Sequence, residues 1–103
     1  MSDEIHVGDV GTVFEVTVMD GEKPLDISSS TERKIFLRRP VDTVVSRDAV
    51  FTNDGIDGKM EIASESGDID IAGVWSIQAK IIIPEGTFYT DIDQFVVEAS
   101  LAV

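Results

Sequence analysis

Residues 74–83 read VWSIQAKIII, and their pattern decides the fold class. The apolar side chains at alternate positions are Trp75, Ile77, Ala79, Ile81 and Ile83, with polar Ser76, Gln78 and Lys80 between them. Successive side chains of a β-strand point to opposite faces of its sheet, so this alternation predicts a strand with one buried face. The turn residues 84–86 (PEG) then lead into residues 87–97, which predicts a β-hairpin. Asp91 and Asp93 interrupt the second strand and predict a bulge or bend between Thr90 and Asp93.

The same alternation recurs along the rest of the chain. Residues 13–19, 33–39, 44–51 and 58–63 each predict a further short strand, and turn-forming Gly, Asp or Pro residues separate them. About seven short strands, with a lone tryptophan early in a late strand, are typical of a two-layer sandwich. We therefore predict an all-β protein: a single immunoglobulin-like β-sandwich domain over residues 1–103, with its core within about residues 5–97.

The charge balance excludes several classes of partner. The 103 residues include 20 acidic and 8 basic side chains, which give a formal net charge of −12. Such a surface repels phosphates and anionic lipid headgroups, so we expect no nucleic-acid and no membrane partner.

The chain has no cysteine, which excludes disulfides, thiolate nucleophiles and cysteine zinc sites. The first residues lack the basic and apolar segments of a signal peptide, so we expect the chain to stay in the cytoplasm or in a particle assembled there.

Residues 52–79 read TNDGIDGKMEIASESGDIDIAGVWSIQA, and the frequent Asp and Gly residues raise the question of a calcium site. Asp54 and Asp57 lack the alternate ligand spacing and the flanking helices of an EF-hand loop. Asp and Gly are also the residues that tight turns need, for local hydrogen bonds and for positive φ. We interpret the stretch as turns between strands, and we expect no metal and no other cofactor.

Catalytic arrangements have little support. Asp68 and Asp70 could in principle act as a general acid and base, as the paired carboxylates of glycosidases do. They flank Ile69, however, in a segment that predicts a loop with Ile69 or Ile71 as its anchor in the core. His6 is the only histidine, and no nucleophile elbow accompanies it. We expect no catalytic residues and no enzymatic activity.

Five of the eight basic residues belong to one predicted hairpin: Arg33, Lys34, Arg38, Arg39 and Arg47. One interpretation is a solvated strand face whose charges pair with nearby carboxylates. The other is a docking surface, on which a basic patch of one subunit meets an acidic patch of the next and sets their register. Both interpretations stay open at the level of the sequence.

Five short motifs follow one another along the chain: GDVGTVF at residues 8–14, PLDIS at 24–28, FLRRP at 36–40, NDGIDGK at 53–59 and AGVWSIQA at 72–79. In this order they resemble the small immunoglobulin-like modules of tailed bacteriophages, and in particular the N-terminal domain of phage baseplate upper proteins. The resemblance covers about residues 5–97. It implies a β-sandwich that joins virion components and has no catalytic residues to carry over.

The function implied by this resemblance is a non-enzymatic structural component of a tailed-phage virion, made in the host cytoplasm. It would be a baseplate, neck or fibre adaptor or a head decoration subunit, and its partners would be other virion proteins and copies of itself. The alternative is a carbohydrate-binding module for host-surface glycans, assisted by calcium. Sugar stacking would need an exposed aromatic ring, whereas the apolar neighbours of Trp75 predict that its ring lies in the core.

Overall fold

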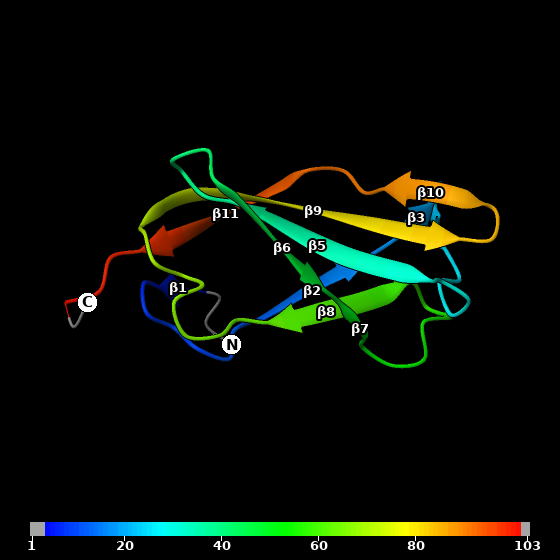
Figure 1. Ribbon diagram of the computed structural model, residues 1–103, viewed down its shortest axis with the longest axis horizontal. Coiled ribbons are helices and arrows are strands. Elements are labelled where there is room, and N and C mark those ends of the chain that lie inside the picture. The colour runs from blue at the N-terminus through cyan, green and yellow to red at the C-terminus, as the bar shows by residue number, and fades with distance from the viewer. Residues whose placement is uncertain (1–3, 102–103) are drawn as a thin grey trace.

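β9 (Gly73–Ile83) is the longest strand and the centre of the larger of the two main sheets (Figure 1). The computed structural model describes residues 4–101. The strand order in the larger sheet is β1 (Ile5–His6), β11 (Asp93–Glu98), β9, β5 (Glu32–Arg38) and β6 (Val44–Asp48), and β10 (Gly86–Tyr89) also pairs with β9. β1 is parallel to β11, and the other pairs are antiparallel. The predicted strand of residues 74–83 is therefore confirmed, together with the hairpin that follows it.

The smaller sheet has the order β2 (Val13–Thr17), β8 (Lys59–Ala63) and β7 (Val50–Phe51). Directly after β2, β3 (Met19–Asp20) and β4 (Lys23–Pro24) form a short separate hairpin. Within residues 4–101, seven strands have four or more residues, namely β2, β5, β6, β8, β9, β10 and β11. The predicted all-β class is confirmed. The described residues form no helix, and so none that could cross a membrane.

The chain changes sheets at Ala49. The sequence predicts one strand over residues 44–51, but β6 pairs with β5 in the larger sheet and β7 pairs with β8 in the smaller one. Ala49 lies between them, is only 4% exposed, and donates its backbone N–H to the carbonyl of Arg33 at 2.9 Å. Because both halves keep the same alternation, the sequence pattern does not reveal the point where the strand leaves its sheet.

The core lies between the two sheets, and Trp75 is at its centre. Trp75 is fully buried, and its indole N–H donates to the carbonyl of Ile71 at 3.0 Å. The Phe95 ring lies 5.9 Å from Trp75 and 5.1 Å from Phe14 of β2, measured between centroids, and so aromatic contacts link the two sheets. Ile69 anchors the loop before β9, with 2% exposure. The predictions for Trp75 and for the loop anchor are confirmed.

A β-bulge separates β10 from β11, as the sequence predicts. Tyr89 is opposite Lys80 and Asp93 is opposite Ile77, so three residues on one strand face two on the other. The extra residue is accommodated at Thr90, whose N–H donates to the carbonyl of Ala79 and whose hydroxyl accepts the N–H of Ala79, both at 2.9 Å. The bulge shifts the alternation, and it brings Asp91 and Asp93 to one side of the sandwich.

Candidate functional site

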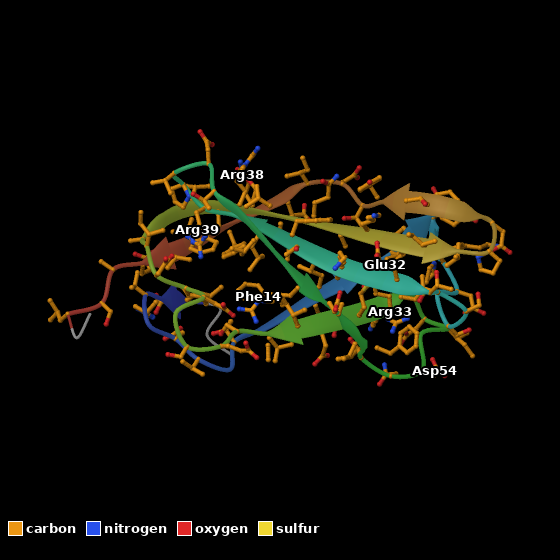
Figure 2. The ribbon with its side chains drawn as sticks, in the orientation of Figure 1. Phe14, Glu32, Arg33, Arg38, Arg39 and Asp54 are labelled. Atoms are coloured by element: carbon orange, nitrogen blue, oxygen red, sulfur yellow. The ribbon has the colours of Figure 1, made fainter. Side chains whose placement is uncertain are left out.

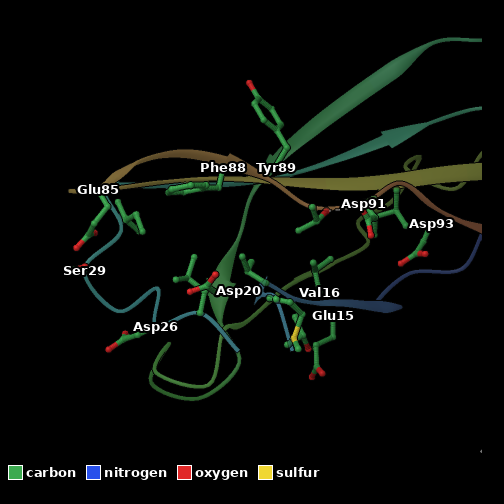
Figure 3. A pocket seen from close by; sticks show the side chains of 18 residues that line it. Glu15, Val16, Asp20, Asp26, Ser29, Glu85, Phe88, Tyr89, Asp91 and Asp93 are labelled. Carbon is green, nitrogen blue, oxygen red and sulfur yellow. Dashed lines mark hydrogen bonds between the residues drawn. The ribbon is translucent and has the colours of Figure 1, made fainter. Parts of the chain in front are cut away.

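A cleft of about 920 Å³ opens between the edge strand β2 of the smaller sheet and β10 of the larger one (Figure 3). Val16 and Leu25 contribute apolar surface from the side of β2 and the β3–β4 hairpin. Ile77, Ile83 and Phe88 contribute it from β9 and β10. The cleft forms because the β3–β4 hairpin pairs with neither sheet and leaves the inner face of the β9–β10 hairpin partly uncovered.

Every charged residue at the cleft is acidic: Glu15, Asp20, Asp26, Glu85, Asp91 and Asp93. The side chain of Glu15, however, points away from the cleft (Figure 3). The acidic residues come from separate parts of the chain: β2, β3 and the segment after β4, the β9–β10 turn, the bulge and the start of β11. Hydrogen bonds from the hydroxyl and the backbone N–H of Ser28, at 2.6 and 2.9 Å, lower the pKa of Asp26 from its ordinary value of 3.8. Asp26 is therefore ionised at neutral pH, and the cleft has a single sign of charge.

Two exposed aromatic side chains lie on opposite faces of β10. Phe88 is opposite the buried Ile81, so its ring belongs to the inner face, where it lies along the cleft and is 44% exposed (Figure 3). Tyr89 is opposite Lys80, and its ring points away from the cleft with 61% exposure. On that outer face Tyr89 lines a second, shallow hollow of about 280 Å³ together with Phe36, Val44 and Ile92.

The backbones beside the cleft are sheet edges. Among the described strands, β2 pairs only with β8, and β10 pairs only with β9. Alternate residues of such a strand present their N–H and C=O groups to the open side. The residues of β10, GTFY, include neither a charge nor a proline, the two features that commonly block an edge from pairing. The cleft thus has an apolar floor, acidic walls and open backbone edges.

The predicted basic cluster does not form one surface. Arg33 and Arg39 continue the inward alternation of Ile35 and Leu37, and Arg47 lies on the same face, opposite Ile35. Lys34 and Arg38 lie on the outer face. Figure 2 shows Arg33 near one end of β5 and Arg38 and Arg39 near the other.

Most of these basic side chains have partners within the chain. Lys34 pairs with Asp48 at 2.9 Å, Arg39 pairs with Asp70 at 2.9 Å, and Arg47 pairs with both Glu65 and Asp68. The guanidinium of Arg33 lies over the Phe51 ring, at 4.3 Å from its centroid, and donates to the carbonyl and hydroxyl of Ser30. This geometry favours the interpretation of paired charges on a solvated face over that of one continuous docking stripe.

The other candidate residues also take local structural roles. Asp68 and Asp70 bind different arginines, and so they do not converge on a common point. Asp54 accepts the N–H of Ile56 at 3.0 Å, and Asp57 accepts the N–H of Lys59 at 3.1 Å and the side-chain amide of Asn53 at 2.8 Å. The turn interpretation of this stretch is confirmed by these bonds, and the bond from Asn53 is the main cause of a lowered pKa of Asp57.

The backbone N–H of His6 donates to the carboxylate of Asp9 at 2.9 Å. Among residues 4–101, no group of three or more His, Cys, Asp and Glu side chains could hold a metal ion.

The sequence reasoning missed the cleft. Its acidic residues are distributed from Glu15 to Asp93, and each one taken alone is a normal residue of a strand end or a turn. One local signal was available, since Asp91 and Asp93 interrupt an apolar strand beside Phe88 and Tyr89. The partner residues on the opposite wall come together with them only when the sheets stack.

Of the comparisons with known proteins, only the one with solved structures gives a match, and it bears on the fold alone. No protein-family model matches the chain, and no curated protein matches its sequence. Among solved structures, CopC from Methylosinus trichosporium OB3b is similar with a TM-score of 0.58 and 11% sequence identity, over 95% of this chain and 86% of that one. The likeness supports the immunoglobulin-like β-sandwich predicted from the sequence.

The prediction of a phage virion component is wrong. A solved structure that matches is CopC from Methylosinus trichosporium OB3b, and nothing in the comparisons indicates a phage protein. The physical reason lies in the motifs behind the prediction. Residues 53–59 are a turn with positive φ at Gly55 and Gly58, and residues 72–79 are the start of a core strand. Turns and strands of this kind recur in β-sandwiches whose strands are joined by short connections. The order of the motifs therefore indicates the fold, and it does not indicate membership of a virion.

Proposed function

We propose that this chain is a non-enzymatic binding module, and that its site is the acidic cleft between β2 and β10. The observation that carries the proposal is that all six charged residues lining an apolar-floored cleft are acidic. The ligand is accordingly cationic and has apolar groups as well. The module acts by binding alone, and no bond is made or broken in it.

The chemistry of the cleft supports this class of ligand. Walls of one charge focus the electrostatic potential and raise the local concentration of a cation, which accelerates its association. The apolar surface of Val16, Leu25 and Phe88 provides the contact area that holds the ligand after it arrives. Trp75 takes no part because it is fully buried, so an indole platform for sugar stacking is not available here.

The test is a titration with an octapeptide of alternating valine and lysine, followed by NMR at low ionic strength. We expect the amide signals of the cleft residues, such as Asp20, Phe88 and Asp91, to shift. The double variant Asp91→Asn/Asp93→Asn should bind about five- to tenfold more weakly, because each exposed ion pair contributes up to about 1 kcal/mol. Binding should also weaken as salt shortens the screening length to about 3 Å at 1 M.

A matched control separates the cleft from the overall charge. Asp42→Asn/Glu98→Gln also removes two negative charges, from exposed positions in the β5–β6 connection and at the end of β11. Both of these elements end on the side of the molecule opposite β10 (Figure 1). Asp42 has a φ of 66°, a conformation that asparagine tolerates, so the fold should be retained. The control should bind as the wild type does. Equal weakening in both double variants, or no binding at all, would contradict the proposed site.

A further inference from the structure

β10 combines three features that no other described strand has together. Its only strand partner is β9, its residues Gly86–Tyr89 carry no charge and no proline, and it lies between two hollows. On its inner face Phe88 borders the acidic cleft, and on its outer face Tyr89 borders the second hollow. That hollow is mainly apolar, with Phe36, Val44 and Ile92, but Arg38 also lines it. The open backbone edge of β10 therefore has a surface on each face that could contact the side chains of an added strand.

We infer that the ligand of the proposed binding site is an extended segment of a partner protein, which adds to the edge of β10 as a further strand of the larger sheet. This inference rests on the proposed function and names the class of ligand. Main-chain hydrogen bonds to β10 would supply affinity, as in other cases of strand addition to a sheet edge. The side chains of the added strand alternate between the two faces and supply the specificity.

The two hollows define the sequence of such a segment. Side chains on the inner face enter a cleft whose charged residues are all acidic, so they are lysine or arginine. Side chains on the outer face lie beside Tyr89 and Ile92, which are 61% and 57% exposed, so they are apolar. The segment therefore alternates basic and apolar residues over at least the four residues of β10.

A second copy of this chain does not fit the same edge. Pairing β10 with β10 of a second copy would bring two acidic clefts together in a chain that already has a net charge of −12. Like charges at such short distances are destabilising, whereas a basic segment neutralises them. The occupant is a basic segment of a different protein.

The experiment compares the alternating valine–lysine octapeptide with the same peptide N-methylated at every residue. N-methylation keeps all the charges and side chains but removes every backbone donor. We expect the N-methylated peptide to bind at least tenfold more weakly. Bound octapeptide should also slow hydrogen exchange of the β10 amides that face away from β9, while the amides of β2 (Val13–Thr17) exchange as before.

The outcomes separate this inference from the proposed function. If both peptides bind equally well, and binding still depends on Asp91 and Asp93, then the strand addition is overturned and the cationic cleft stands. Protection of β2 amides in place of β10 amides would likewise overturn the assignment of the edge. If the octapeptide does not bind at all, the proposed function fails, and the strand addition fails with it.

Discussion

Gly58 shows how a single residue positions the candidate site. Its φ is 74°, and its carbonyl accepts the N–H of Val18 at 2.8 Å. A Cβ at this position would lie 2.6 Å from the carbonyl oxygen of Val18 and 2.9 Å from that of Leu25. Both of those residues line the cleft, so the absence of a side chain at position 58 lets the floor of the cleft pack against the turn before β8.

Gly58→Ala should therefore destabilise the protein strongly. The left-handed conformation costs an alanine about 1–2 kcal/mol, and the contact with backbone atoms adds about 1–3 kcal/mol of overpacking. Gly67→Ala is the matched control, because its φ is 86° but nothing lies within 4 Å of an added Cβ. Gly67→Ala should lose only the about 1–2 kcal/mol that the left-handed conformation costs an alanine. The check is urea unfolding of both variants, and equal losses would show that the close approach at Gly58 is relieved without cost.

At the scale of the elements, the bulge between β10 and β11 shapes one wall of the cleft. It interrupts the pairing with β9 for three residues, and the hydroxyl of Thr90 replaces the missing carbonyl as the acceptor for Ala79. Ala79 is fully buried, so its N–H has no access to water there. The position of Asp91 and Asp93 in the cleft therefore depends on one side-chain hydroxyl.

Thr90→Val keeps the shape of the side chain but removes this acceptor. It should lower the free energy of unfolding by about 1–3 kcal/mol, the range for a buried donor left without a partner. Thr87→Val, on the exposed part of β10, is the control and should change stability by less than about 0.5 kcal/mol. Denaturant unfolding measures both values. If the two variants are equally stable, the hydroxyl of Thr90 does not hold the bulge.

At the scale of the whole molecule, the protein depends on contacts between sheets that are built from distant segments. Trp75 of β9 packs against Phe95 of β11 with the rings tilted, and Phe95 in turn contacts Phe14 of β2. Arg39 and Asp70 form an ion pair beside this cluster, and the guanidinium of Arg39 lies 5.8 Å from the centroid of the Trp75 ring. One tryptophan thus joins the two sheets and the loop before β9.

Trp75→Ala should destabilise the protein by about 3–5 kcal/mol, as expected for truncation of a fully buried aromatic side chain. Val74→Ala is the control in the same strand, since Val74 is 52% exposed on the outer face, and it should lose less than about 1 kcal/mol. Urea unfolding followed by circular dichroism gives both values. A loss for Trp75→Ala as small as that for Val74→Ala would contradict the central place of the indole in the core.

The local pattern of the sequence determined the elements of this protein. Alternating apolar residues predicted β9 and its hairpin, Asp91 and Asp93 predicted the bulge, and Asp54 and Asp57 predicted a turn. These features depend on backbone geometry and on neighbours a few residues apart, so the sequence contains them directly. The same locality explains the wrong functional prediction, because turn and strand motifs are shared by unrelated β-sandwiches.

Only the tertiary structure decided the site. The change of sheet at Ala49, the pairing of Arg39 with Asp70 and of Arg47 with Asp68, and the cleft itself all depend on how the two sheets stack. Glu15 and Asp20 are about seventy residues from Asp91 and Asp93 in the chain, yet they line one cavity. Charge and apolar pattern are properties of each segment, whereas a binding cleft is a property of the space between segments, and that space exists only once the core has packed.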